Sequence, residues 1–479
     1  MDSERTAPGP LELLDRWRGR FGLVLAPLAA VLTWHSVEQA RAPVAALFVV
    51  AGVLWVSEAV HPAVTALLVV ALAPLLGACS AKEAFSALGN PVLFLFVGSF
   101  MIAEAMRLHG LGDRLAHALS ERTNGRLGAL VATSSSAFLM SMWISNAAAT
   151  AVVLPIVLSL GRSLGDDAAA RRYRSALVLG VAWASSMGGL CTPVGTPPNL
   201  IGMRAMRELG LGIDFIGWMR IATPMALLML VAMWVVLAVV FGIRPGQPAP
   251  RPPPIHVRWR AGEVAATCAF AVAIVGWTVP GVLDALGHPA AGTLRARLPE
   301  EVTALLAATI LFVWPIREAD GAKLRRALTW QDAARIDWGT VILFGGGILL
   351  GDLANKSGLA RVWGEALMEL SGAQSAVAIT ALVTIAAVVL SELASNTAAA
   401  TLMIPLAIGL ADAAQIDRLP PLLGATLGAS FGFMMPISTA PNAMAYATGE
   451  VTIRQMIRAG VLFDVVGAVV IIAVLALLF

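Results

Sequence analysis

Long apolar runs dominate the chain and predict helices that cross a membrane. A spanning helix needs roughly 20 residues, and several runs approach this length, among them 43–60, 221–243, 262–280 and 456–479. Other apolar segments are shorter, namely 128–144, 148–161, 376–394 and 398–411. Such lengths suit re-entrant segments, which turn back inside the membrane, better than full spans. We expect an all-α polytopic membrane protein with about eleven transmembrane helices plus two re-entrant hairpins.

The polar interruptions of this apolar pattern occur as matched pairs. Ser145-Asn146 separates the first two short segments, and Ser395-Asn396 separates the other two. Each is followed by a second polar loop that contains proline: Gly195–Asn199 in the first half and Ser438–Asn442 in the second. Corresponding interruptions in two halves of a membrane protein are the best sequence pointer to a transporter binding site.

The two halves of the chain align around a proline-rich linker. Asn146 matches Asn396, and a proline nine residues further on is shared. Thr196 likewise matches Thr439. If each half holds an odd number of spans, the second copy enters the membrane from the opposite side. The alignment therefore predicts two inverted-topology repeats.

Composition excludes an ordinary soluble protein. Apolar residues make up 58% of the chain and charged residues 13%, whereas soluble domains carry about 25% charged residues. The first 20 residues lack the apolar core and cleavage pattern of a signal peptide. Most Lys and Arg residues fall on the side of the N-terminus once the spans are assigned, which predicts a multi-pass protein of the cell (inner) membrane with a cytoplasmic N-terminus.

The chemistry of the polar loops favours an anion together with a small cation. At a hairpin tip the second arm begins with unpaired N–H groups and the positive end of its dipole, where Asn or Ser is a preferred cap. Thr196 and Thr439 are placed to cap helices that begin with proline. Serine and asparagine oxygens, with the carbonyls of broken turns, are neutral ligands for an alkali cation. Because these loops contain no Lys or Arg, a bound anion needs helix ends and co-bound cations for neutralisation.

Other interpretations of these residues have to be weighed. Ser, Thr and Asn also join membrane helices by hydrogen bonds, but two aligned copies, each with its proline loop, favour a site. Glu392 beside the second tip is either functional or a structural hydrogen-bonding group, and its counterpart is Met142. A channel would need a polar lining along whole spans, and a membrane enzyme would need convergent titratable groups; neither pattern is present. Residues 110–124 and 358–372 are amphipathic and predict interfacial helices.

On these motifs the chain resembles the divalent anion/sodium symporter family, the sodium-coupled di/tricarboxylate and sulfate carriers. The family's Ser-Asn-Thr tips correspond to Ser145-Asn146-Ala147 and Ser395-Asn396-Thr397. The resemblance implies a first sodium site formed by Ser141, Ser145, Asn146 and Gly195, and a second formed by Ser391, Ala394, Asn396 and Ser438. It implies substrate contacts from Asn146, Asn396 and Thr397, and we expect Thr196 and Thr439 at the substrate as well. No cofactor is expected beyond the sodium ions that couple transport.

The resemblance implies a secondary active transporter that imports a small divalent anion with sodium by an elevator type of alternating access. The expected substrate is a C4-dicarboxylate of the succinate, malate or fumarate class. A sodium-independent dicarboxylate exchanger and a sulfate transporter remain alternatives. The expected partners are membrane lipid and a second copy in a homodimer, with no nucleic acid. Ala147 and Ala440 stand where the family usually has Thr and Pro, which leaves the substrate selectivity open.

The same resemblance divides the chain into scaffold and transport parts. Each repeat is expected to begin with a scaffold part and to continue with a transport part that carries the re-entrant hairpin. The division is 1–20 for the cytoplasmic N-terminal segment, 21–127 and 128–243 for the scaffold and transport parts of repeat 1, 244–261 for a cytoplasmic linker, and 262–373 and 374–479 for the scaffold and transport parts of repeat 2.

Overall fold

The computed structural model describes residues 10–111, 114, 125–162, 164, 167–244, 246–248, 259–317 and 324–479. Within these ranges the protein is built of helices, with one short antiparallel pair of strands, β1 (Pro315–Arg317) and β2 (Leu324–Arg326). Most of the predicted linker and most of the predicted amphipathic helix at 110–124 lie outside the described residues. The second predicted amphipathic helix is confirmed as helix α17 (Leu359–Ser371).

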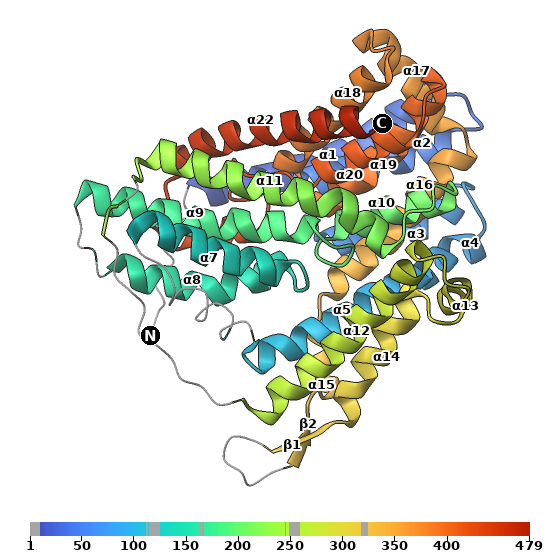
Figure 1. Ribbon diagram of the computed structural model, residues 1–479. Coiled ribbons are helices and arrows are strands. Elements are labelled where there is room, and N and C mark those ends of the chain that lie inside the picture. Colours follow the sequence, from blue (N-terminus) through green and yellow to red (C-terminus); the bar gives the residue numbers. More distant parts are fainter. Residues whose placement is uncertain are drawn as a thin grey trace, which may run out of the picture.

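The helices before the linker fall into an N-terminal group and a group around the first polar loops (Figure 1). The N-terminal group comprises α1 (Pro10–Ser36), α2 (Ala42–Ser57), α3 (Pro62–Leu75), α4 (Ala81–Ser86), the 3₁₀ helix η1 (Ala87–Gly89) and α5 (Pro91–Leu108). The second group comprises α7 (Gly125–Ser141), α8 (Asn146–Arg162), α9 (Ala168–Leu190), α10 (Pro197–Glu208) and α11 (Phe215–Phe241).

The helices after the linker also fall into two groups. The first group comprises α12 (Ala261–Ala285), α13 (Ala290–Arg297), α14 (Glu300–Val313), α15 (Trp330–Ala333), α16 (Trp338–Lys356) and α17. The second comprises α18 (Ala376–Leu393), α19 (Asn396–Ala414), α20 (Leu419–Gly428), α21 (Ala440–Ala447) and α22 (Ile453–Leu478).

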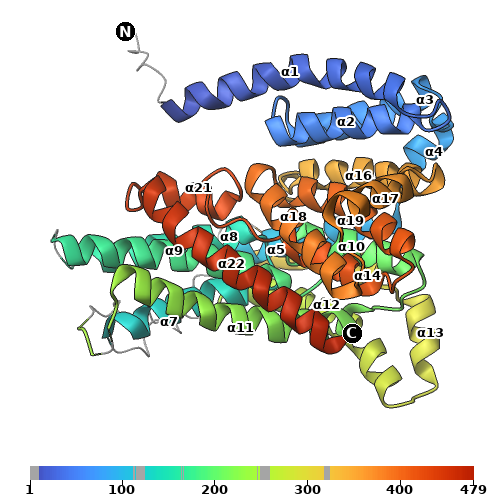
Figure 2. The ribbon, with the colours of Figure 1, turned by 90° about the horizontal axis from the view of Figure 1, so that it is seen from above.

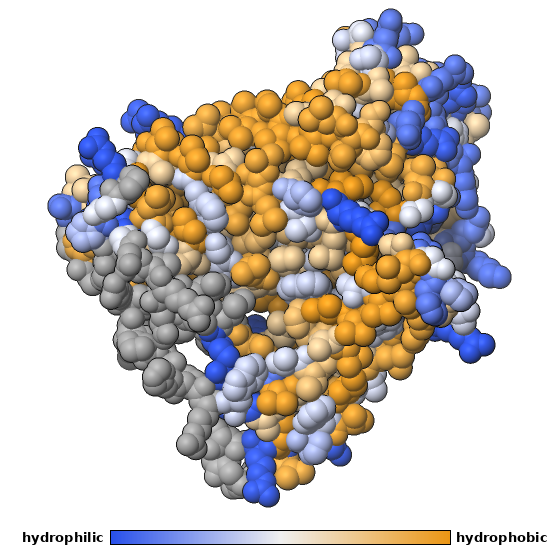
Figure 3. Space-filling model, viewed as in Figure 1, coloured by the Kyte–Doolittle hydropathy of each residue, from blue (hydrophilic) through white to orange (hydrophobic). Residues whose placement is uncertain are grey.

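Helix length and surface chemistry confirm an all-α polytopic membrane protein. In the described part of the chain, 7 helices are long and apolar enough to cross a membrane, and further apolar helices such as α2, α3 and α8 are shorter. Two of the 7 are α18 and α19, the arms of the second hairpin, so the expectation that these arms are too short to span is wrong by length: α19 continues to Ala414, past the apolar segment 398–411. Apolar side chains cover much of the face seen in Figure 3, while hydrophilic residues gather toward its ends. The exact number of spans and the inverted topology stay predictions.

In space, helices from both halves of the chain pack into two groups, one on each side of the molecule. Helices α5, α12 and α14 contact one another in one group, where Gly98 permits a close approach: a Cβ there would lie 2.6 Å from the carbonyl carbon of Ala304. In the other group α9 contacts α7, α8 and α11, and α11 contacts α22. Helices α1 and α2 pack together along one edge (Figure 2).

The same local arrangement occurs in both repeats. Helices α7 and α8 form one hairpin and α18 and α19 form the other, and in each hairpin the two arms contact each other. Helix α9 packs against both arms of the first hairpin, as α20 does against both arms of the second. Glycines permit this close packing, since a Cβ at Gly428 would lie 2.8 Å from the carbonyl oxygen of Thr384. Each hairpin is therefore held against the helix that precedes its partner loop.

Candidate ion and substrate site at the broken helices

The first hairpin turns between Ser141, where α7 ends, and Asn146, where α8 begins. The Ser141 hydroxyl donates a hydrogen bond to Asn146 Oδ1 at 2.7 Å. Ser145 Oγ accepts a bond from the backbone N–H of Ala148 at 3.3 Å. Serine thus caps the second arm, while the asparagine lies in its first turn with its Oδ1 beside a buried hydroxyl.

The second hairpin reproduces this geometry. The Ser391 hydroxyl donates to Asn396 Oδ1 at 2.8 Å, and Ser395 Oγ accepts from the N–H of Ala398 at 3.3 Å. Ser391 Oγ also lies 2.8 Å from the carbonyl oxygen of Ala429, so the Ser391 hydroxyl has two carbonyl oxygens within hydrogen-bonding distance. Carbonyl oxygens of unwound backbone are a type of ligand that coordinates sodium in transporters.

The partner loops are tied by the asparagines at their ends. Asn199 Nδ2 donates to the carbonyl oxygens of Gly189 and Thr192, each at 2.8 Å. Asn442 Nδ2 donates to Gly432 at 2.8 Å and to Met435 at 3.0 Å. These bonds fix unwound backbone between two helix ends.

Each partner loop lies directly against its own hairpin tip. A Cβ at Gly189 would lie 2.5 Å from Asn146 Oδ1 and 3.2 Å from the carbonyl oxygen of Gly195. A Cβ at Gly432 would lie 3.0 Å from Ser438 Cβ and 3.1 Å from the carbonyl oxygen of Ser391. The structure therefore brings together the predicted ligands from the tip and the loop of each repeat.

The two repeats also contact each other through the helices that follow these loops. Helix α8, the second arm of the first hairpin, contacts α21, which begins just after the second partner loop. Helix α10, which begins just after the first partner loop, contacts α19, the second arm of the other hairpin, and also α20. The starts of α8, α10, α19 and α21 carry the predicted substrate residues, which are Asn146, Thr196, Asn396, Thr397 and Thr439.

The two threonines of the partner loops differ. Thr439 Oγ1 accepts a bond from the N–H of Asn442 at 3.2 Å and so caps α21. Thr196 occupies the same position before α10 but makes no side-chain cap bond, and only 3% of it is exposed. The expected side-chain cap is confirmed at Thr439 and is wrong at Thr196, whose hydroxyl makes no bond to the first turn of α10.

Glu392 has a structural hydrogen-bonding role. Its carboxylate accepts bonds from the N–H groups of Met434 at 2.7 Å and Met435 at 3.1 Å. The Ser438 hydroxyl donates to the same carboxylate at 2.6 Å. Glu392 thereby holds the second partner loop and places a negative charge beside a predicted sodium ligand. Among the described residues of the first repeat, no carboxylate binds the partner loop in this way. The Thr192 hydroxyl instead donates a hydrogen bond to the carbonyl oxygen of Met142.

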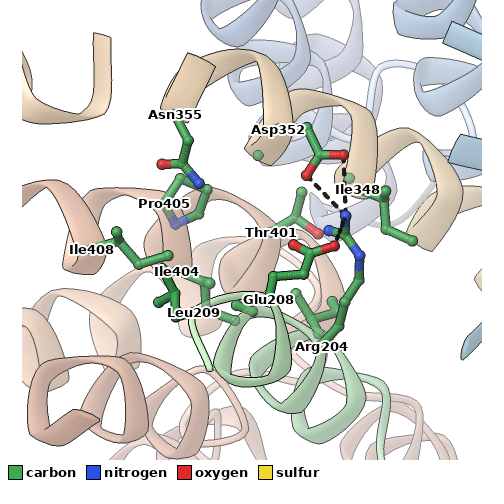
Figure 4. Close-up of a pocket in the computed structure, with 14 residues that line it drawn as sticks. Arg204, Glu208, Leu209, Ile348, Asp352, Asn355, Thr401, Ile404, Pro405 and Ile408 are labelled. Carbon is green, nitrogen blue, oxygen red and sulfur yellow. Dashed lines mark hydrogen bonds and ion pairs between the residues drawn. The ribbon is translucent and has the colours of Figure 1, made fainter. Parts of the chain in front are cut away.

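Sequence reasoning missed a charged cluster close to this site. Arg204 on α10 binds Asp352 on α16 with Nη2 to Oδ1 and Oδ2 distances of 2.8 and 3.1 Å. It also pairs with Glu208, one turn along its own helix, at 2.5 Å. The cluster borders a small pocket of about 50 Å³ between α10, α16 and α19 (Figure 4). Asp352 lies 148 residues from Arg204 in the chain, so no local pattern could have paired them.

The fold and the paired broken-helix loops define a multi-pass membrane transporter. A family model described as "Citrate transporter" matches residues 52–417 and 291–479. The chain belongs to this family, and its place among the divalent anion/sodium symporters, expected from its motifs, is thereby confirmed. Because the family consists of transporters, the protein is a transporter and not an enzyme.

Two named relatives support this assignment, and one solved structure shares the fold. The chain is 30% identical to the "Sodium-dependent dicarboxylate transporter SdcS" of Staphylococcus saprophyticus over 95% of this chain and 90% of the relative. The protein of the same name from Staphylococcus aureus (strain USA300) is also 30% identical, with the same coverage. The crystal structure of the Alcanivorax borkumensis YdaH transporter superposes with a TM-score of 0.56 and 14% identity, covering 87% of this chain and 98% of that one. At that identity the superposition shows the fold alone.

Proposed function

We propose that this transporter imports a small divalent anion, a C4-dicarboxylate of the succinate, malate or fumarate class, together with sodium ions. The observation that carries the proposal is the repeated Ser–Asn geometry: Ser141 to Asn146 at 2.7 Å and Ser391 to Asn396 at 2.8 Å, each beside an unwound loop. The name of the relatives, sodium-dependent dicarboxylate transporter, supports the same ligand pair.

The sodium ions would occupy the oxygen clusters at the two tips. In the first cluster the ligands would be Ser141, Ser145, Asn146 and the backbone at Gly195. In the second they would be Ser391, Ala394, Asn396 and Ser438, with the Glu392 carboxylate bound to the Ser438 hydroxyl. Neutral oxygens suit a small cation, and the bound cations would supply the positive charge that the loops lack.

The dicarboxylate would lie between the two tips. The N-terminal ends of α8 and α19 offer N–H groups and the positive ends of helix dipoles to an anion. With Oδ1 of each asparagine turned to a serine hydroxyl, the Nδ2 groups of Asn146 and Asn396 are suited to donate to the two carboxylates. Thr397 would add a hydroxyl in the second half, where the first has Ala147. Thr196 and Thr439 would add contacts at the starts of α10 and α21.

We propose an elevator mechanism in a homodimer of the cell membrane, with the N-terminus in the cytoplasm. The moving part would comprise residues 128–243 and 374–479, which hold both hairpins and both partner loops. The scaffold would comprise residues 21–127 and 262–373. The cross-repeat contacts of α8 with α21 and of α10 with α19 support a moving part that travels as one body.

Uptake of labelled succinate into proteoliposomes tests the function. Saturable accumulation driven by an inward sodium gradient, and absent with potassium or a proton gradient, is the expected result. Sodium-indifferent exchange of internal for external succinate would identify an exchanger. Inhibition by sulfate but not by malate or fumarate would identify a sulfate carrier.

A further inference from the structure

Three ion pairs join the proposed moving part to the proposed scaffold at one end of the molecule. The moving part contributes two arginines near the end of α10 and the aspartate that caps α11. The scaffold contributes groups from α13, from the start of α14 and from the last turns of α16. The pairs are Arg204–Asp352, Arg207–Glu300 and Asp214–Arg295.

The first pair closes a small apolar pocket. The Arg204 side chain is 11% exposed and points from α10 toward Asp352 on α16 (Figure 4). Ile348 on α16 and Ile404 on α19 line the same pocket. Because Arg204 is largely withdrawn from water while Asp352 is 37% exposed, the pair is only partly desolvated and is somewhat stronger than one on an open surface. This pair is therefore well placed to hold α10 and α19 against the scaffold.

The other two pairs extend the contact to the start of α11. Glu300 binds Arg207 and also accepts a bond from the N–H of Phe215 at 3.0 Å. Arg295 binds Asp214 at 2.6 Å. One surface of the scaffold thus binds both the end of α10 and the first turn of α11. These two helix ends flank the turn at 209–214.

Two of the arginines in these pairs also bind a second carboxylate within the same part of the protein, the moving part or the scaffold. Arg204 pairs with Glu208 of its own helix at 2.5 Å. Arg295 pairs with Asp284 of the scaffold at 3.0 Å. Removing the only partner of a buried charge is strongly unfavourable. An ion pair between the two parts therefore breaks more easily when the arginine keeps another carboxylate beside it. Asp352 is 37% exposed, and water can solvate it once Arg204 leaves.

We propose that these three ion pairs form a reversible latch that closes the translocation path at the α10 end and opens once in each transport cycle. The latch rests on the elevator mechanism proposed above. When the moving part slides, Asp352, Glu300 and Arg295 stay with the scaffold, while Glu208 travels with Arg204. The ion pairs Arg174–Glu450 and Arg325–Asp332, by contrast, each lie within one part and need not break.

The test measures how readily the pocket opens. Ile404 lines the pocket and is 3% exposed. Ile404→Cys is introduced into a chain with Cys79→Ala, Cys191→Ala and Cys268→Ala, and its rate of labelling by a maleimide is followed in the full-length protein in lipid nanodiscs. Asp352→Asn is expected to raise this rate about tenfold or more. Asp352→Glu, which keeps the charge, is expected to leave the rate close to that of the parent.

Two controls separate opening of the latch from loss of structure. Glu365→Gln removes a carboxylate from the Arg361–Glu365 pair within α17 and should not change the labelling rate. A cysteine at Leu177, buried in α9, should stay unreactive with Asp352→Asn. An unchanged rate at Ile404→Cys, or an equal rise at Leu177→Cys, would overturn the latch. Because labelling needs no substrate, a failure to transport succinate would defeat the proposed function without deciding the latch.

Discussion

The two hairpin tips share a backbone design but differ in their side chains. In both, a serine five residues before the asparagine donates to its Oδ1, at 2.7 and 2.8 Å. The second tip adds the Glu392 carboxylate and the Ser438 hydroxyl, where the first has Met142 and Gly195. It also has Thr397 where the first has Ala147. Repeat symmetry therefore gives both tips the same backbone frame for the proposed ligands, while the side chains make the second tip richer in oxygen atoms.

The largest expected effect comes from the residues that the tips share. Asn146→Ala and Asn396→Ala should each lower sodium-driven succinate uptake at least about 100-fold, because each removes a proposed cation ligand and a proposed donor to the substrate at once. Uptake into proteoliposomes measures this, with the gel-filtration profile of each variant as the control for folding. Parental uptake in both variants would contradict the shared role of the tips.

The next largest effect should distinguish the two tips. Glu392→Gln places an amide NH₂ where the carboxylate now accepts bonds from Met434, Met435 and Ser438. A donor facing another donor leaves a buried group unsatisfied, at a cost of about 1–3 kcal/mol. The sodium concentration for half-maximal uptake should rise about tenfold.

The matched change in the first repeat is Met142→Leu, which conserves volume. Since only the backbone carbonyl of Met142 bonds to the partner loop, sodium dependence should change less than about twofold. Equal responses of Glu392→Gln and Met142→Leu would show that the carboxylate makes no difference between the tips.

A smaller effect should be similar in the two halves. Ser141→Ala and Ser391→Ala each remove one hydroxyl bonded to an asparagine, worth about 1 kcal/mol, or roughly a fivefold rise in the sodium requirement. The effect should be somewhat larger for Ser391, whose hydroxyl also bonds the carbonyl oxygen of Ala429. Sodium titrations of uptake measure both. Effects that differ by more than about tenfold would show that only one of the two clusters binds sodium.

The smallest effect concerns the substrate. Ala147→Thr gives the first tip the hydroxyl that Thr397 provides in the second, and one added hydrogen bond should lower the KM for succinate about threefold. Thr397→Ala should raise it by a similar factor. A KM that is unchanged by Ala147→Thr would show that residue 147 does not face the substrate.

Sequence patterns predicted the hairpins and their tips because these depend on short-range features. The apolar segments 128–144 and 148–161 correspond to α7 and α8. Three of the four segment ends differ from the helix ends by two or three residues, and the fourth differs by one. Helix α10 begins at Pro197, directly after Thr196. Length, proline positions and polar interruptions are all readable along the chain.

What the sequence could not predict depends on packing between distant segments. The bonds that resolve the role of Glu392 reach residues 42 to 46 positions away. Thr196 has the same position before its helix as Thr439 but makes no cap bond, and the Arg204–Asp352 pair joins the two repeats. Absence of Lys and Arg from the loops suggested that no fixed cation lies close, yet Arg204 is only two turns of α10 beyond them.

Binding of succinate to the purified transporter with and without sodium tests the central claim most directly. If the tips of both repeats hold cation and anion side by side, sodium should tighten succinate binding at least about tenfold, measured by calorimetry at constant ionic strength. Asn146→Ala should remove this coupling. A succinate affinity that is the same in sodium and in potassium would contradict the account.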